Sequence, residues 1–212
     1  MAYTFDELAP REALVSIAKT FHQRGWMLGT AGNLSVRLSP GQMVITASGK
    51  SKGQLQNTDF LQVNIEDAEI IESYDPTNTP SAETKIHQVL YQLFPDMNAC
   101  LHVHSVQASL LTANMPSDIG AIRLANLEMI KGFDIWQQTP NVNLAVFENQ
   151  LDVAKIADEI FHHFTSSPPD ISALLIRSHG VTVWGETLQQ AYNRLEIMEF
   201  ILDYMVRAGH ST

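Results

Sequence analysis

The sequence predicts an α/β fold in which a mixed β-sheet is flanked by helices, in a single domain over residues 1–212. Segments with the period of an amphipathic helix alternate with short apolar segments typical of strands. Two early strands are joined by a tight turn, which argues against a purely parallel, doubly wound sheet. No internal repeat and no linker rich in Gly, Pro or Ser divides the chain.

The first third of the chain is predicted to contain one helix and three strands. Residues 9–24 form the helix, because apolar residues recur at helical spacing and Gly25 follows as a stop. Strands are expected at 34–38 and 43–47, joined by Ser-Pro-Gly-Gln with Pro and Gly at the centre of a type II turn. Residues 60–65 alternate between apolar and polar, as a half-buried strand does.

In the middle of the chain, a polar loop precedes a helix with Ser81 as its predicted N-cap, and Pro95 ends that helix. Residues 99–104 are expected to form a strand and residues 105–113 a helix. No element is assigned to residues 114–140.

The last third is predicted to hold a helix at 151–164, a buried strand at 173–177, a hairpin-like strand at 181–185 and a long final helix at 187–208. Apolar residues of the final helix extend over more than one narrow face. Such breadth is typical of deep burial or of a contact between subunits.

Charge limits the class of partner. Thirteen Lys and Arg stand against 23 Asp and Glu, so the formal net charge is −10. Nucleic-acid binding needs clustered cations to neutralise phosphates, so no nucleic-acid partner is expected. A small anionic substrate remains compatible with this charge, because local loops can reverse the field inside one pocket.

The compartment is predicted from cysteine usage and from the absence of targeting segments. Cys100 is the only cysteine, so no internal disulfide is expected and a cytoplasmic location is predicted. The N-terminal segment has neither the basic nor the apolar part of a signal peptide. Charged residues interrupt the apolar stretch 197–206, so no membrane span or membrane partner is expected.

Three histidines predict a metal site. His102 and His104 flank Val103 in an apolar strand, and side chains at i and i+2 of a strand point to the same face. His179 lies at the end of another apolar strand and is followed by a glycine, which lets the chain turn near a ligand. A catalytic zinc ion takes about three protein ligands and keeps one position open. The alternative is a pair of surface histidines beside a core valine.

The remaining histidines are expected to be exposed or hydrogen-bonded structural residues, since they lie on helical patterns or near the C-terminus: His22, His87, His162, His163 and His210.

Two loops rich in Gly, Ser and Thr, at 29–33 and 47–53, are candidates for binding an anion. Backbone N–H groups, hydroxyls and a nearby ammonium form such concavities. Gly-Lys-Ser at 49–51 is not a nucleotide phosphate-binding loop, because that motif needs a glycine where this chain has Val44. Either loop alone is more often a plain turn.

Glu83 and Glu128 are the candidate acid/base residues. Glutamates in early helical turns usually stabilise the helix dipole, and Glu128 could be a solvated helix residue. Spacing alone therefore selects neither.

Five segments follow one another as GTAGNLSVR, ITASGKSKG, SAET, HVHS and RSHGVTVWGET. This order resembles the motifs of the class II aldolase and adducin family over about residues 10–205. The resemblance implies a class II aldolase-like α/β/α fold. It also implies a homotetramer with active sites at subunit interfaces and a small-molecule sugar-phosphate substrate.

The same resemblance assigns roles to residues. His102, His104 and His179 are implied to hold one Zn²⁺ per subunit. The positions that surround the substrate phosphate in the family are Asn33, Ser48, Gly49 and Ser81, with Lys50 and Lys52 nearby.

Within the family, EMIKG at 128–132 and HGVTVWGET at 179–187 are similar to a dehydratase subfamily of methionine salvage. In that subfamily the glutamate corresponding to Glu128 is the acid/base residue. Sugar-phosphate aldolases use a glutamate at the position of Glu83. A lyase of the dehydratase type is therefore expected, and the alternative is an aldolase or epimerase acting on another ketose phosphate. A non-catalytic domain like the adducin head is a third interpretation, and the three convergent histidines argue against it.

Overall fold

A nine-stranded sheet runs through the computed structural model, which describes residues 4–113, 115–116 and 119–209. Its order is β4-β3-β2-β1-β5-β9-β8-β7-β6, and β7 and β8 pair in parallel while the other neighbours are antiparallel. The predicted mixed sheet is thus confirmed. The strands are β1 (Asn33–Ser39), β2 (Gln42–Thr46), β3 (Phe60–Asn64), β4 (Ile70–Glu72), β5 (Ala99–Val103), β6 (Ala121–Arg123), β7 (Asn143–Phe147), β8 (Ala173–Ile176) and β9 (Gly180–Gly185).

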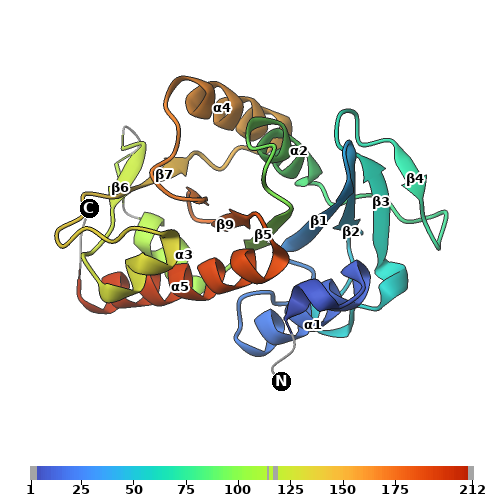
Figure 1. Ribbon diagram of the computed structural model, residues 1–212, viewed down its shortest axis with the longest axis horizontal. Helices are drawn as coiled ribbons and strands as arrows, with labels where there is room; N and C mark the ends of the chain where they lie inside the picture. Colours follow the sequence, from blue (N-terminus) through green and yellow to red (C-terminus); the bar gives the residue numbers. More distant parts are fainter. Residues whose placement is uncertain (1–3, 114, 117–118, 210–212) are drawn as a thin grey trace.

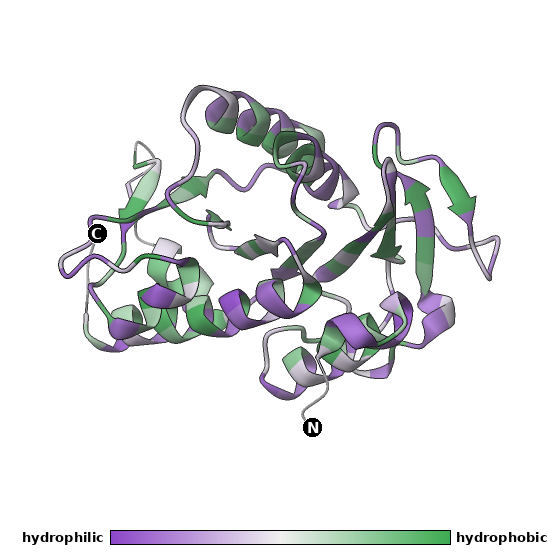
Figure 2. Cartoon of the chain, viewed as in Figure 1, coloured by the Kyte–Doolittle hydropathy of each residue, from purple (hydrophilic) through white to green (hydrophobic). Residues whose placement is uncertain are grey.

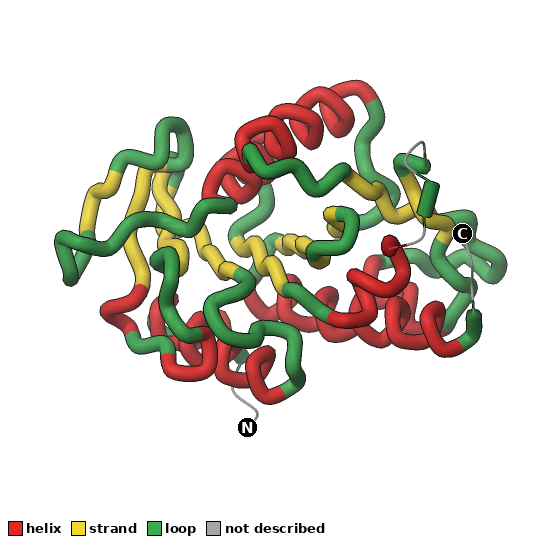
Figure 3. The backbone as a smooth tube through the Cα atoms, turned by 180° about the vertical axis from the view of Figure 1, so that it is seen from behind, coloured by secondary structure: helices red, strands yellow, loops and turns green. Residues whose placement is uncertain are grey.

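Helices cover both faces of the sheet (Figures 1 and 3). One face is packed by α2 and α4, and the other by α1, α3 and α5. Figure 2 shows hydrophobic and hydrophilic residues in alternating bands along α4 and α5, as expected of helices with one face toward a core. The helices are α1 (Pro10–Gln23), α2 (Thr84–Leu93), α3 (Val106–Ala113), α4 (Val153–Ser166) and α5 (Leu188–Arg207).

Strand β5 shows how the sheet separates two hydrophobic cores. Leu101 and Val103 pack toward α1, α3 and α5, whereas Cys100 packs toward α2 and α4. Because side chains alternate along a strand, His102 lies on the same face as Cys100. The period of two therefore directs the His102 side chain to the α2 side of the sheet.

Most of the predicted elements are confirmed close to their expected bounds. The early turn is also confirmed, since Gly41 between β1 and β2 has a φ of 82°, the left-handed value that a type II turn requires at this position. β8 and β9 are antiparallel neighbours, as the hairpin-like pattern predicted.

The predicted N-cap of α2 was wrong. Ser81 lies in a turn before the helix, where its carbonyl oxygen accepts from Thr84 N at 3.0 Å and its hydroxyl from Glu83 N at 3.3 Å. Glu83 occupies the N-cap position instead. The preceding turn thus places the Glu83 carboxylate at the end of the helix and away from solvent.

The segment 114–140, to which the sequence assigned no element, is mostly irregular. Apart from residues 114 and 117–118, which lie outside the described part, it contains the short strand β6 and a 3-10 helix, η4 (Glu128–Phe133). Neither element is long enough to show a clear periodic pattern.

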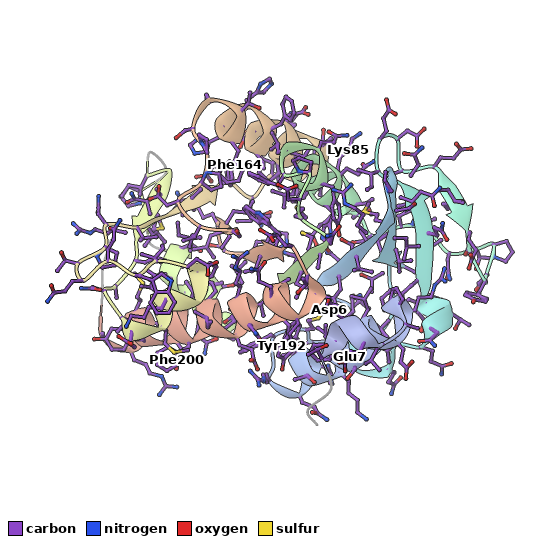
Figure 4. The ribbon with its side chains drawn as sticks, in the orientation of Figure 1. Asp6, Glu7, Lys85, Phe164, Tyr192 and Phe200 are labelled. Carbon is purple, nitrogen blue, oxygen red and sulfur yellow. The ribbon has the colours of Figure 1, made fainter. Side chains whose placement is uncertain are left out.

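The broad apolar surface of α5 consists of a buried part and an exposed part. Met198 and Ile201 are fully buried, whereas Phe200 is 51% exposed and lies on the outer side of the helix (Figure 4). At the start of α5, the Asp6 carboxylate accepts from Leu188 N at 2.8 Å, and Tyr192 stacks on Phe21.

Across the described residues, no helix combines the length and apolar character that a membrane span requires.

Candidate metal and substrate site

One cluster of potential metal ligands stands out among the described residues. Glu83, His102, His104 and His179 each offer a ligand atom, and these four atoms lie within 4.8 Å of one another. Oε1 of Glu83 lies 2.8 Å from Nε2 of His179 and 3.3 Å from Nε2 of His102. Nε2 of His104 is 3.0 Å from Nε2 of His179. The structure thus brings together the three histidines and one of the two predicted glutamates.

Three neighbouring strand ends position the histidines. His102 is in β5, and His104 follows the strand, where its N–H donates to the carbonyl of Trp26 at 2.9 Å. His179 lies in the turn between β8 and β9. Ser178 makes that turn with a φ of 50°, so the left-handed residue is Ser178 and not the glycine that the sequence suggested.

Gly180 has a different function from the predicted turn. A Cβ at this position would lie 2.1 Å from the carbonyl oxygen of Val103 and 3.2 Å from the His102 ring. Glycine is therefore required because the β9 backbone passes very close to β5 at the cluster.

Replacing Gly180 with alanine should separate β9 from β5. We expect Tm to fall by about 6 °C or more, the shift for a loss of about 3 kcal/mol in a chain of this size, with a parallel loss of metal binding. Scanning fluorimetry and metal analysis measure both effects. Gly120→Ala is the matched control, because Gly120 is exposed and has no atom near its virtual Cβ. Equal Tm values for the two variants would contradict this role of Gly180.

Hydrogen bonds behind the imidazoles direct their Nε2 atoms toward one point. Nδ1 of His179 lies 3.2 Å from Oδ1 of Asn149, an acceptor, so Nδ1 carries the proton and Nε2 keeps its lone pair. Nδ1 of His102 lies 2.9 Å from Oγ1 of Thr182. Burial lowers the pKa of His102 to about 3, so its ring is neutral, as a metal ligand must be.

The cluster meets the requirements of a divalent metal ion. It combines one carboxylate with three imidazoles, a set that suits zinc and similar ions. Glu83 Oε1 and His102 Nε2 are buried and have no hydrogen-bond partner among the described residues. Bound metal would satisfy both atoms, whereas an empty site leaves two polar atoms without partners.

Glu83 is ionised by its surroundings. Burial alone would raise its pKa, but positive charge at the cluster, on protonated imidazoles of His102, His104 and His179 or on a bound divalent ion, holds the pKa well below its usual range. The side-chain amide of Asn33 also donates to Oε2 of Glu83. The carboxylate is therefore a fixed negative charge beside the imidazoles.

A cavity of about 390 Å³ opens beside the cluster. The four positions that the family resemblance places around a phosphate all line it, namely Asn33, Ser48, Gly49 and Ser81. Glu83, His104 and His179 line the same cavity, so the two glycine-rich loops and the ligand cluster face one space.

Of the two nearby lysines, Lys52 lines this cavity. It is 2% exposed, and its ammonium donates to the carbonyls of Thr30 and Lys50 at 2.8 and 3.0 Å. Burial lowers its pKa, while the charges of Glu83 and Asp59 oppose that shift. Lys50 instead forms an ion pair with Asp59 at 3.5 Å.

Glu128 is not part of this arrangement within one chain. Its side chain is 82% exposed and pairs with Lys131, and it lines a separate cavity with Trp136. The described residues thus place Glu83 at the cluster and Glu128 on an open surface.

Of the other histidines, His22 and His87 are hydrogen-bonded and His162 and His163 are exposed on α4. His210 lies outside the described residues. The sequence missed that His87 and Ser35 are buried beside Asn33, and it missed Thr182 and Asn149 behind the imidazoles. The recurrence of Glu83, His87 and Tyr91 at every fourth position, which places three polar side chains on one side of α2, is the signal that could have revealed the first pair.

Comparison with known proteins agrees with this geometry. The model of the class II aldolase and adducin N-terminal domain family matches residues 12–206. A protein named methylthioribulose-1-phosphate dehydratase from Microcystis aeruginosa is 52% identical over 199 residues, which are 94% of this chain and 96% of the relative. One of the same name from Leptospira biflexa is 42% identical over 207 residues, covering 95% of this chain and 99% of the relative.

Among solved structures, L-fuculose-1-phosphate aldolase from Thermus thermophilus superposes with a TM-score of 0.71 at 23% identity and covers 93% of each chain. At this identity the likeness concerns the fold alone.

Proposed function

Since the chain belongs to the class II aldolase and adducin family, we propose that it is a lyase that dehydrates 5-methylthioribulose 1-phosphate. The product is the 2,3-diketo-5-methylthiopentyl 1-phosphate, and the reaction is a step of methionine salvage. One observation carries this function: the glutamate and the three histidines converge in a chain that is 52% identical, over nearly its full length, to a protein named for this reaction.

We assign His102, His104 and His179 as the residues that would hold one Zn²⁺ per subunit, beside the carboxylate of Glu83. When bound, zinc would supply a Lewis acid that polarises the substrate oxygens. The imidazoles keep neutral rings directed at one point, and Thr182 and Asn149 fix two of those rings from behind.

The protein's carboxylates carry the protons. The C2 carbonyl of the substrate makes the C3 proton acidic, and a carboxylate base removes it. The same proton, or one from a second acid, assists departure of the C4 hydroxyl as water. The resulting enol then takes up a proton at C4 to give the diketone, so the net change is the loss of one water. Glu83 and Glu128 are the proposed acid/base pair.

The loop at 47–49 and the turn at Ser81 are the proposed phosphate site. Ser48 and Ser81 offer hydroxyls, and Gly49 allows the close approach of backbone N–H groups to an anion. The buried Lys52 adds positive charge to a protein that is acidic overall. Asn33 borders the same space.

Incubation with 5-methylthioribulose 1-phosphate, followed by mass analysis, tests this function. A product lighter by one water supports dehydration. Formation of dihydroxyacetone phosphate would instead identify an aldolase, which breaks the C3–C4 bond. The aldolase remains the second candidate because Glu83, the residue that sugar-phosphate aldolases use, is the carboxylate at the cluster.

The exposed position of Glu128 leads us to propose that it serves the metal site of a neighbouring subunit. A homotetramer with active sites at subunit interfaces would bring the 128–136 surface of one chain to the cavity of the next. The exposed Phe200 on α5 supplies apolar surface for such contacts.

Light scattering at micromolar concentration should therefore return a mass near four times the 23.6 kDa of one chain. The apolar side chains left on the surface, among them Phe200 and Trp136, give the physical reason. A mass near that of one chain would exclude the tetramer and, with it, a role for Glu128 at a neighbour's site.

We place the enzyme in the cytoplasm, with a small sugar phosphate as its substrate and neither nucleic acid nor membrane as a partner. The single Cys100 is fully buried in the described fold and suits a reducing compartment.

A further inference from the structure

A chain of buried polar side chains leads from the metal-site carboxylate into the core between β1 and α2. The amide of Asn33 contacts Glu83 on one side and His87 on the other, with 2.6 Å between Asn33 Oδ1 and His87 Nε2. On the far side of the ring, Nδ1 of His87 lies 2.6 Å from the hydroxyl of Ser35. That hydroxyl lies 3.0 Å from the hydroxyl of Tyr91.

These residues come from two facing surfaces with matched periods. Glu83, His87 and Tyr91 recur every four residues along one side of α2, and Asn33 and Ser35 are two apart on one face of β1. His87 and Ser35 are fully buried and Asn33 is 1% exposed. Burying this many polar groups is favourable only if each one finds a hydrogen-bond partner. Each donor in this row of side chains must therefore face an acceptor.

Hydrogen-bond chemistry gives the chain a single direction. The NH₂ group of Asn33 donates to Oε2 of Glu83, so the Asn33 oxygen is the atom that faces His87. Nε2 of His87 must then carry a proton to donate to that oxygen. Burial lowers the pKa of His87 to about 4, so the ring is neutral and Nδ1 is an acceptor.

The same reasoning orients the two hydroxyls. Ser35 donates to the unprotonated Nδ1 of His87, so its oxygen is free to accept from Tyr91. Burial strongly raises the pKa of Tyr91, which keeps its O–H group available as the donor. Every donor from Tyr91 to Asn33 therefore points toward Glu83.

We infer that His87 is a positioning residue that holds the Asn33 amide in the one orientation that donates to Glu83, and so sets the direction of the Glu83 carboxylate beside the metal ligands. Its role in turnover rests on the proposed dehydration. Without the Nε2 proton of His87, the Asn33 oxygen is buried without a donor, and the amide is free to rotate away from Glu83.

The tautomer of His87 provides a test that does not depend on activity. In a long-range ¹H–¹⁵N spectrum of chelator-treated, ¹⁵N-histidine-labelled protein at neutral pH, the signals that disappear in His87→Gln belong to this ring. We expect a protonated Nε2 and an unprotonated Nδ1. A ring protonated at Nδ1, or at both nitrogens, would overturn the inferred direction of the chain.

Kinetics of two variants test the positioning role. His87→Leu should lower kcat by about 10–100-fold, the usual cost of losing an outer-shell partner, with KM changed by less than about twofold and metal content unchanged. His87→Gln can still donate from its amide to the Asn33 oxygen, and it should recover most of the kcat. Tyr91→Phe, which removes only the outermost donor, should change kcat by less than about threefold.

The outcomes separate this role from general stability. A Leu variant with normal kcat, or a Gln variant as impaired as the Leu variant at equal Tm and metal content, would overturn the positioning role. If the Leu variant does not fold, the His87 tautomer and the kcat of the Gln variant still test the positioning role. If the wild-type protein does not dehydrate methylthioribulose 1-phosphate, the proposed function fails while the His87 tautomer can still be as inferred.

Discussion

His104→Ala protein is expected to lose its metal ion and nearly all activity while keeping its fold. In the proposed zinc site its imidazole is one of three nitrogen ligands, and the remaining ligands would no longer close the coordination shell. The loss of turnover should exceed the roughly 100-fold effect of losing an outer-shell partner. His104 is the best of the three to replace, because its side chain is 31% exposed while that of His102 is 2% exposed and bonded to Thr182.

Metal analysis after dialysis against a chelator measures this result, with circular dichroism as the check on folding. Wild-type protein should retain about one divalent ion per chain, and His104→Ala close to none. His162→Ala is the matched control, since His162 is exposed on α4 and lies outside the cluster. His104→Ala protein that keeps a full complement of metal would sink the ligand assignment.

Local patterns explain why much of the fold and the clustering of the histidines could be predicted from the sequence. Apolar periodicity located α1 and α5, and the Pro-Gly pair located the turn between β1 and β2. The convergence of His102 and His104 follows from the period of two along a strand. These inferences need only neighbours in the sequence, so tertiary packing did not overturn them.

The residues that sequence reasoning missed depend on contacts between distant segments. Asn33 meets Glu83 and His87 across separations of 50 and 54 residues. Pairing of β1, β5 and β9 places Asn33, His102 and Thr182 side by side. No local sequence pattern indicates that residues from three different strands lie side by side. Ser81 was misassigned as the N-cap because a turn that resembles a cap precedes α2, and the true cap residue, Glu83, is directed at the imidazoles.

For Glu128, the role predicted from the sequence and the position in a single chain point in different directions. The EMIKG resemblance assigns it an acid/base role, yet its carboxylate is 82% exposed and pairs with Lys131. Glu128→Gln should lower turnover by about 100-fold or more with metal content unchanged, the typical effect of removing a positioned acid/base group. Glu83→Gln is the comparison. If that variant is inactive while Glu128→Gln keeps near-normal turnover, Glu83 is the principal base and the site works as in an aldolase.

Mixed tetramers should show directly whether Glu128 acts on a neighbour's site. When His104→Ala and Glu128→Gln chains are co-expressed with different tags and purified through both, some interfaces combine the intact histidines of one chain with the intact Glu128 of the next. Random assembly of equal amounts makes about one quarter of the sites complete, so activity should rise to about one quarter of the wild-type level, although each variant alone is nearly inactive.

The control pairs His104→Ala with His179→Ala, whose lesions lie in the same half of the site, so no interface is complete and no activity should return. Absence of recovery in the first mixture, with both chains present in the tetramers, would mean that Glu128 acts within its own chain or not at all. Its position argues against action within its own chain, because the Glu128 carboxylate is 82% exposed, pairs with Lys131 and lines a different cavity from the one beside His104 and His179.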